Sequence, residues 1–250
     1  MISGGQPQPN GYMWLLARTG TSADLQELNL TTDKIDQITP ASSSSTSVSQ
    51  SPSGVVGVGL ATTTTGALEF HNGTSGALVA TVPIGAPVKG VVAGADGSTF
   101  YVLNGSNTSM SVTLVNDQTD KVSVSVPVPL NTVAVTVDPT GQTLSALSAD
   151  GHIDQVNLGT GAVSSVFPVG STPVAIASAD TGGKLYVLKS SSDGAAADVG
   201  VVDTATESQT RALPAPAHSL GLQVSPDGRT LFVIVGTSSF GNVQTLPLSP

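Results

Sequence analysis

The residues of this sequence best suited to chemistry are three histidines, one of which has acidic neighbours. His152 stands between Asp150 and Asp154 in the segment "DGHID", and imidazole and carboxylate groups at such short spacing are ligands for divalent metal ions. The Asp150-Gly151 pair is also the signal of a tight turn between two strands. Because the turn explains the same residues without a ligand, we interpret the segment as structural and predict no metal site.

The other two histidines occupy different settings. His71 comes directly before Asn72 in a segment that alternates like a strand, and we expect it at a strand edge. His218 lies in the loop segment "PAPAHS", where a side chain can meet a ligand from solvent. We therefore keep His218 as a candidate binding residue.

The sequence has no recognisable catalytic set. Serine is abundant, but no G-x-S-x-G elbow lies between a strand and a helix. Acid–base catalysis by paired carboxylates needs desolvated groups that converge, whereas the acids here concentrate in predicted turns. We predict no catalytic residues and no cofactor. The turn acids, which we expect to be solvated, are Asp33, Asp96, Asp117, Asp120, Asp138, Asp180, Asp203, Glu207 and Asp227.

Composition excludes several classes of protein. Only 10% of the 250 residues are charged and 39% are hydrophobic, so the chain can bury a core and is not disordered through high charge. The net charge of -9, with eight Lys and Arg residues, argues against binding to nucleic-acid backbones. The chain has no cysteine, which excludes disulfides and thiolate metal sites.

No targeting or membrane-spanning segment stands out. The sequence has no apolar stretch of about 18 residues that could span a bilayer. Its start, "MISGGQPQPN", lacks the basic and apolar regions of a signal peptide. Richness in Ser, Thr, Gly, Ala and Val is nevertheless associated with the bacterial cell envelope. We expect an extracellular or periplasmic location.

A repeat supplies the elements that must position these residues. Six turn glycines recur at successive gaps of 43, 43, 44, 42 and 45 residues, and such a fixed period is the mark of a repeat architecture. A second marker keeps the same phase, with Asn or Asp opening segments such as "NGTSGA" and "DTATES". The glycines are Gly11, Gly54, Gly97, Gly141, Gly183 and Gly228; the second markers are Asn29, Asn72, Asn116, Asn157 and Asp203.

Four short strands, named a to d, fit in each repeat. In the third repeat they are predicted near Gly90–Ala93, Thr99–Asn104, Ser109–Val115 and Lys121–Val126. Apolar residues alternate or run continuously in these segments, and helical spacing is absent. Four antiparallel strands in each repeat of this length are typical of a β-propeller blade.

We therefore predict an all-β fold, a six-bladed β-propeller with incomplete terminal blades, or alternatively part of a seven-bladed ring. A single domain is expected over residues 1–250, with repeats at about 1–42, 43–87, 88–129, 130–172, 173–216 and 217–250. Strands b are expected at about Tyr12–Ala17, Val55–Leu60, Thr99–Leu103, Thr143–Leu147, Leu185–Leu188 and Leu231–Val235.

The two ends of the sequence leave the closure of the ring open. The sixth repeat stops at "NVQTLPLSP", before a fourth strand, and "ISGGQPQ" makes a poor first strand because it contains two glycines and a proline. Two alternatives follow. Either the N-terminal segment adds an edge strand to the last or first blade, or this chain comes from a longer one.

The repeat resembles the YVTN β-propeller family and, more loosely, surface-protein and lactonase-like seven-bladed propellers. The resemblance rests on "ADGSTFYVLN", "GGKLYVLKS" and "SPDGRTLFVIV" for strands a and b, and on "DVGVVDTATES" for strand c and its turn. Two repeats depart from it. The second has Ser53 where Asp is usual, and the fourth has "LSAL" in place of "YVLN". The resemblance implies a fold rather than an activity, because such propellers carry many functions.

The expected function follows from the contrast between strands a and the loops. Lys89 is the sole charged residue in or beside the predicted strands a, so a catalytic channel is not expected. The b–c and d–a loops are long and polar, and loops often carry function. We predict a non-catalytic, monomeric scaffold that binds a protein or glycan partner, not nucleic acid. The alternatives are a lactonase-like hydrolase and the sensor domain of a membrane-anchored receptor. The candidate binding residues are Arg18, Lys189, Phe240, His218 and Lys89.

Overall fold

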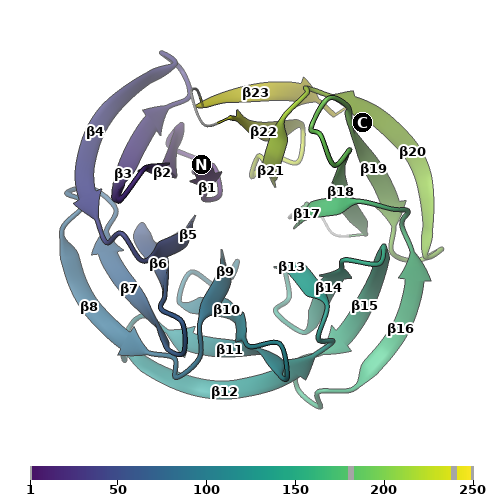
Figure 1. Ribbon diagram of the computed structural model, residues 1–250, viewed down its shortest axis with the longest axis horizontal. Helices are drawn as coiled ribbons and strands as arrows, with labels where there is room; N and C mark the ends of the chain where they lie inside the picture. Colours follow the sequence, from purple (N-terminus) through teal and green to yellow (C-terminus); the bar gives the residue numbers. More distant parts are fainter. Residues whose placement is uncertain (1, 180–182, 238–240, 249–250) are drawn as a thin grey trace. The chain divides into compact units, whose positions relative to one another are not determined.

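The protein has an all-β fold, that of a six-bladed β-propeller (Figure 1). It is represented by a computed structural model in which residues 2–179, 183–237 and 241–248 are described. Within these residues there is no helix. The chain divides into two compact units, Met1–Leu130 and Asn131–Pro250. The prediction that residues 1–250 form one domain stays a prediction.

The first unit contains blades 1 to 3, each an antiparallel sheet of four strands. Blade 1 consists of β1 (Ile2–Gly4), β2 (Tyr12–Thr19), β3 (Ser22–Asn29) and β4 (Lys34–Ala41). Blade 2 consists of β5 (Ser45–Gln50), β6 (Val55–Ala61), β7 (Gly66–Asn72) and β8 (Leu78–Pro83). Blade 3 consists of β9 (Val88–Ala93), β10 (Thr99–Gly105), β11 (Met110–Asn116) and β12 (Lys121–Val128).

The second unit contains blades 4 to 6. Blade 4 consists of β13 (Thr132–Val137), β14 (Thr143–Ser148), β15 (His152–Asn157) and β16 (Val163–Pro168). Blade 5 consists of β17 (Pro173–Ser178), β18 (Lys184–Ser190), β19 (Ala197–Asp203) and β20 (Ser208–Ala215). Blade 6 has three strands in the described part of the chain, β21 (Ser219–Val224), β22 (Thr230–Gly236) and β23 (Gly241–Pro247).

The predicted strand pattern is confirmed. The six segments expected as strands b are β2, β6, β10, β14, β18 and β22, and each belongs to a different sheet. Of the proposed roles for the N-terminal segment, the edge strand of the first blade is the one observed, because β1 pairs with β2 from Ile2 opposite Ala17 to Gly4 opposite Leu15. The strand is short, as the two glycines and the proline of "ISGGQPQ" lead one to expect.

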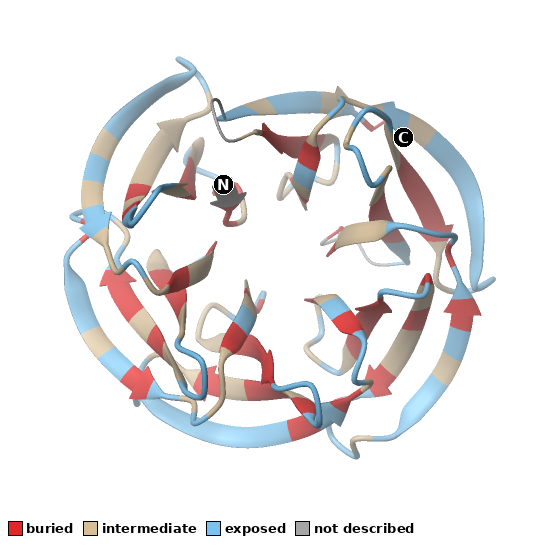
Figure 2. Ribbon diagram, viewed as in Figure 1, coloured by how far each residue is buried: buried red, intermediate tan, exposed pale blue. Residues whose placement is uncertain are grey.

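Burial explains why strands b are the most apolar. In β10, the residues from Phe100 to Leu103 are all at most 3% exposed, because both faces of the strand are covered. The fourth strand of blades 1 to 5 is mostly exposed, whereas strands b are mostly buried (Figure 2). In blades 1 to 5, each sheet thus changes from buried to exposed from strand b to strand d.

Two kinds of turn connect the strands of a blade. In the a–b turns, Gly97 and Gly228 have φ of 76° and 69°, a conformation that a residue with a side chain adopts only with strain. In the c–d turns, an Asn or Asp carboxamide or carboxylate oxygen accepts backbone N–H groups. Asn72 Oδ1 accepts them from Thr74 at 3.0 Å and Ser75 at 2.9 Å. The predicted markers therefore stabilise turns, as expected for these residue types.

Candidate functional site

The predicted binding residues belong to both units of the chain. Arg18 is in β2 of blade 1, and its Nη2 atom donates a hydrogen bond to the Ser43 carbonyl oxygen at 3.0 Å. Lys89 is in β9 of blade 3. Phe240 lies outside the described residues. The remaining two, Lys189 and His218, lie at the same end of blade 5, where its b–c loop and the neighbouring d–a loops are found.

Lys89 is exposed for a structural reason that the sequence pattern did not indicate. The pairing of β9 with β10 shifts register so that Lys89 is an extra, bulged residue between Val88 and Gly90. In the other blades whose strands a and b pair with a register shift, the extra residue also stands near the start of strand a. The side chain of a bulged residue lies outside the regular packing of the sheet. A charged side chain is tolerated there. The equivalent residues are Thr46, Val133, Val174 and Leu220.

Lys189 is held at the end of β18 by two side chains. Its Nζ atom lies 3.0 Å from Asp198 Oδ1 in β19 and donates a hydrogen bond to Gln209 Oε1 at 3.1 Å. The lysine side chain is 14% exposed and the Asp198 side chain 45%. The lysine is therefore fixed by its partners, while the Asp198 side chain is partly exposed and its Oδ1 atom is buried beside the lysine.

A hollow of about 400 Å³ surrounds this ion pair. Its walls are the d–a loop at 170–172 and the two arms of the b–c loop of blade 5, at 189–191 and 196–198. Hydroxyl groups of Ser171, Thr172 and Ser191 line it beside the charged pair. The volume is within the range of about 300–1,000 Å³ that is common for ligand sites.

The loops beside this hollow carry an unusual backbone. Thr172 and His218 occupy the same position in the d–a loops before and after blade 5, and their φ angles are 57° and 60°. Their carbonyl oxygens accept N–H groups from Ser190 and Gly236 at the ends of strands b. The His218 N–H donates to the Gly194 carbonyl oxygen at 2.7 Å. A β-branched residue at positive φ is a genuine outlier, so Thr172 is strained.

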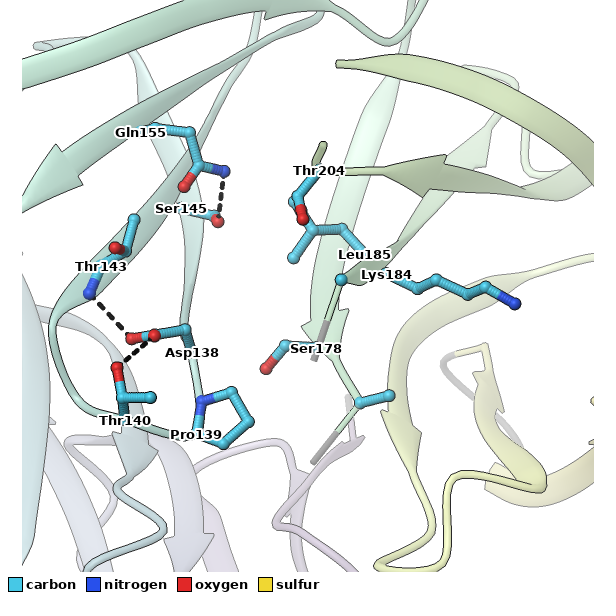
Figure 3. Close-up of a pocket in the computed structure, with 12 residues that line it drawn as sticks. Asp138, Pro139, Thr140, Thr143, Ser145, Gln155, Ser178, Lys184, Leu185 and Thr204 are labelled. Carbon is cyan, nitrogen blue, oxygen red and sulfur yellow. Dashed lines mark hydrogen bonds between the residues drawn. The ribbon is translucent and has the colours of Figure 1, made fainter. Parts of the chain in front are cut away.

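A second hollow, which the sequence analysis missed, lies at the opposite end of blades 4 and 5. It has a volume of about 420 Å³. Figure 3 shows the residues that line it. Ser145, Gln155 and Thr143 of blade 4 face Ser178 and Leu185 of blade 5 across it. Gln155 Nε2 donates a hydrogen bond to Ser145 Oγ at 2.8 Å. The departure of the fourth repeat from the usual pattern, "LSAL" in place of "YVLN", was the available signal.

The hollow exists because Ser145 stands where four other blades have an aromatic ring. Ser145 is the third residue of its strand b, and the third residues of the other strands b are Trp14, Gly57, Tyr101, Tyr186 and Phe232. Within each unit this side chain faces the next blade. Tyr186 packs with Leu222 and Val224 of blade 6, and the Trp14 Nε1–H group donates to the Gly73 carbonyl oxygen in blade 2 at 3.3 Å.

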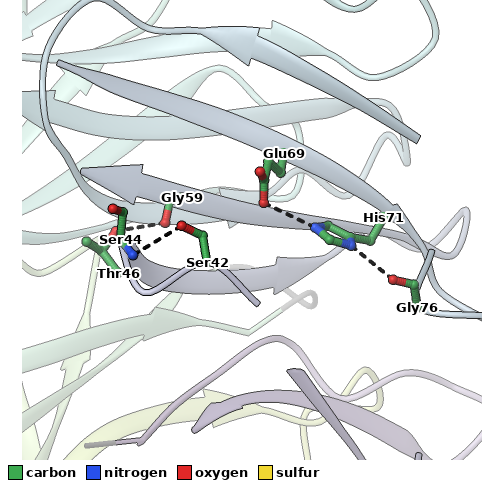
Figure 4. A network of polar contacts seen from close by, with 7 residues as sticks. All are labelled: Ser42, Ser44, Thr46, Gly59, Glu69, His71 and Gly76. Atoms are coloured by element: carbon green, nitrogen blue, oxygen red, sulfur yellow. Dashed lines mark hydrogen bonds and ion pairs between the residues drawn. The ribbon is translucent and has the colours of Figure 1, made fainter. Parts of the chain in front are cut away.

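Two histidines have structural surroundings. His71 is only 5% exposed, so the expectation that it lies at an open edge is wrong. Its Nδ1 atom is 3.0 Å from the Gly76 carbonyl oxygen and its Nε2 atom 3.4 Å from Glu69 Oε2 (Figure 4). The reason is that β8 pairs with β7 from Ala67 to His71, so β7 is not an edge strand of its sheet. His152 Nδ1 lies 3.3 Å from Asp150 Oδ1 in an exposed turn.

Across residues 2–179, 183–237 and 241–248, no cluster of three or more His, Asp or Glu side chains is arranged to hold a metal ion.

The turn carboxylates differ in pKa according to their hydrogen bonds. Burial opposes ionisation of Asp96, but hydrogen bonds from Thr99 and Ser98 outweigh it and lower its pKa. Hydrogen bonds from Ser225 and the Arg229 N–H lower the pKa of Asp227. The pKa of Asp117 is raised, first by burial and then by the charges of Asp96 and Asp120. Both of its carboxylate oxygens are buried without a hydrogen-bond partner.

No helix capable of spanning a membrane occurs in the described part of the chain. No protein-family model matches the sequence, and no curated protein matches it either. The resemblance to YVTN propellers therefore stays a prediction.

Solved structures show a clear likeness in fold. A chain of Kuenenia stuttgartiensis hydrazine synthase is similar with a TM-score of 0.69 and 14% identity, over 93% of this chain and 72% of that one. A chain of a mitotic checkpoint complex has a TM-score of 0.67 and 15% identity, over 96% of this chain and 72% of that one. At such low identity the likeness shows that the chain has a β-propeller fold, and it assigns no activity.

Proposed function

We propose that this protein is a non-catalytic binding module that holds a protein partner at the loop end of blade 5. The observation that carries the proposal is the hollow around Lys189 and Asp198, flanked on both sides by non-glycine residues at positive φ. Strained backbone of this kind costs about 1–3 kcal/mol for each residue and clusters at functional sites. Among the described residues, no other d–a loop has a non-glycine residue at positive φ, so this feature is specific to the two d–a loops beside blade 5.

The charges of the b–c loop favour a partner that carries basic side chains. Asp193 lies in the middle of the loop and Asp198 lies in β19. The Asp198 side chain is 45% exposed, although its Oδ1 atom is buried beside the lysine. Hydrogen bonds from Ser191 and the Ala195 N–H lower the pKa of Asp193, which keeps it ionised. The chain as a whole has a net charge of -9, and complementary charge speeds association and aligns partners.

A protein suits this end of the blade better than a small substrate. The rim consists of loop backbone and short hydroxyl side chains around the hollow, so a partner can add hydrogen bonds over an area larger than the hollow itself. The location outside the cytoplasm is part of the proposal and rests on composition alone.

Matched charge removals at the two ends of the blades test the proposal. Asp193→Asn with Asp198→Asn should abolish capture of the partner in pull-downs from the native source, and the melting temperature should stay within the small range usual for surface changes. Asp33→Asn with Asp120→Asn makes the same chemical change in the c–d turns, where both residues have positive φ that asparagine tolerates. Loss of capture in the turn variant with retention in the loop variant would place the binding surface at the other end.

A further inference from the structure

We infer that the hollow between blades 4 and 5 at their turn end binds a single neutral sugar unit. This site is independent of the proposed protein-binding surface, which lies at the other end of blade 5. Its volume of about 420 Å³ is enough for one small ring with its hydroxyl groups, at the low end of ordinary ligand sites.

The hollow is a built feature of two adjoining sheets. At the blade 5–6 contact, the ring of Tyr186 is 4% exposed and fills the equivalent space. At the blade 2–3 contact, Gly57 lacks a side chain, but Phe100 of blade 3 occupies the space, since a Cβ atom on Gly57 would lie 2.6 Å from Phe100 Cε1. At the blade 4–5 contact, Ser145 faces Leu185, and neither residue is large enough to fill the space.

The walls of the hollow offer hydrogen-bond donors and acceptors that remain available to a ligand. Ser145 is 5% exposed; its Oγ atom accepts from Gln155 Nε2, which leaves the hydroxyl proton to donate. The Gln155 Oε1 atom and the hydroxyl groups of Thr143 and Thr204 make no hydrogen bond within the described part of the chain. A ligand with several hydroxyl groups, each a donor and an acceptor, matches this mixture.

The charged groups around the hollow favour a neutral ligand. The Asp138 carboxylate already accepts the N–H groups of Gln142 at 2.9 Å and Thr143 at 2.7 Å and the hydroxyl of Thr140. The Lys184 side chain points away from the hollow (Figure 3). Among the described lining residues, no uncompensated charge therefore faces the ligand, and an ionic ligand would lose its hydration without gaining a partner from them.

Apolar surface completes the match to a sugar. Pro139, Ala179 and Leu185 contribute carbon atoms to the lining, and the C–H face of a pyranose ring can pack on them. None of the lining residues in the described part of the chain has an aromatic ring on which a sugar could stack. Affinity should therefore be in the millimolar range, as roughly expected for a small ligand.

Titration by NMR of the full chain, labelled with ¹⁵N, tests the inference. The probes are methyl glycosides of glucose, galactose, mannose and N-acetylglucosamine, with glycerol as the control polyol. We expect at least one glycoside to bind saturably, with shifts concentrated at the Gln155 side-chain amide and the backbone of Thr143 and Ser178. Ser145→Tyr should weaken that binding at least tenfold because the ring fills the hollow. Gln155→Leu should weaken it severalfold without filling the space.

Ser192→Tyr is the matched control, since Ser192 is exposed in the b–c loop at the other end of blade 5, and it should bind as the wild type does. Failure of every glycoside to bind, glycerol binding as tightly as the glycosides, or wild-type affinity in Ser145→Tyr would each overturn the inference. None of these results bears on the partner-capture experiment.

Discussion

Blade 5 meets its two neighbours within residues 131–250 through different chemistry. Against blade 6 it presents Tyr186, which packs with Leu222 and Val224 in a continuous apolar cluster. From blade 4 it receives Ser145, and a polar hollow remains. In both contacts the side chain concerned is the third residue of a strand b. The difference teaches that the repeat specifies the backbone, whereas single side chains decide whether a contact is closed or open.

The contact between blades 2 and 3 adds a third arrangement. Gly57 provides no side chain, and the Phe100 ring from the next blade enters the space. Its centroid lies 5.2 Å from that of Phe70, at an interplanar angle of 57°, a favourable tilted geometry. One ring closes the contact, and it can come from either blade.

Removing the ring that closes the contact between blades 5 and 6 should have the largest effect on stability. Tyr186→Ser copies the blade 4–5 contact into the blade 5–6 contact and removes a buried ring. We expect a loss of about 3–5 kcal/mol in the free energy of unfolding, as for other large-to-small changes in a core. The urea unfolding midpoint measures it. A loss below about 1 kcal/mol would show that the ring does not close this contact.

Adding one carbon atom at Gly57, in the contact between blades 2 and 3, should cause the next largest loss of stability. A Cβ atom in Gly57→Ala would lie 2.6 Å and 2.7 Å from two ring carbons of Phe100, and overpacking of this kind costs about 1–3 kcal/mol. The double variant Gly57→Ala with Phe100→Leu should recover part of the loss, since the shorter side chain leaves room. Strict additivity in this double-mutant cycle would contradict the packing explanation.

Filling the hollow between blades 4 and 5 with a ring should stabilise the protein, by less than the two preceding changes destabilise it. Ser145→Tyr buries a ring against Leu185 but removes the hydrogen bond from Gln155. The two effects oppose each other, and we expect a gain of up to about 1 kcal/mol in urea unfolding. Ser192→Tyr should leave the midpoint unchanged. A clear destabilisation by Ser145→Tyr alone would mean that the hollow is too small for a ring.

The smallest change in the free energy of unfolding should come from two carboxylates in the turns of blade 3. The Asp96 carboxylate accepts hydrogen bonds, whereas the Asp117 carboxylate has no hydrogen-bond partner. The pKa of Asp117 is raised in the folded protein, so the folded state binds its proton more tightly than the unfolded chain. Its contribution to stability therefore falls as pH rises from the ordinary aspartate pKa through the raised value. Asp117→Asn should stabilise the protein near pH 7, because it removes a charge whose two oxygens are buried without a hydrogen-bond partner. The residue as a whole is half-buried, and we expect a gain of less than about 1 kcal/mol.

Substitution of Asp96, in the same blade, should change stability in the opposite direction to substitution of Asp117. Its pKa is lowered, so its stabilisation is present above the ordinary pKa and is lost as pH falls through the lowered value. Asp96→Asn should be destabilising near pH 7. Urea midpoints of both variants at about pH 3 and pH 7 measure the contrast. Equal signs for the two substitutions at neutral pH would contradict the assigned causes.

The fold could be predicted from the sequence because its signals are local. A glycine such as Gly97 is required by its own φ, and a run such as "FYVL" is apolar because both of its faces are covered. These requirements recur once in every repeat, and the strands b lie in the predicted segments. The exposure of Lys89 was visible only after the bulge in β9 was known.

The candidate sites were harder to predict because they depend on residues from two blades. Lys189 was selected from its loop, but its partner Asp198 and the strain at Thr172 are set by the pairing of β18 and β19 and by the loop before β17. The hollow at Ser145 required knowledge of the opposing Leu185 as well. A small residue at this position is not sufficient, since Gly57 leaves no such space.

The Asn72 turn also bears on the chemical ageing of the protein. An Asn-Gly pair is prone to deamidation, because the nitrogen of a following glycine can attack the side-chain amide unhindered. The chain cannot remove this pair by replacing Gly73, since a Cβ atom there would collide with the Gly54 carbonyl oxygen. The Gly73 N–H instead donates to that oxygen at 2.9 Å, which restrains the attacking nitrogen in the folded state. Should Asn72 still convert to aspartate, the turn would carry the residue type that Asp203 already provides in blade 5, with the same two N–H donors.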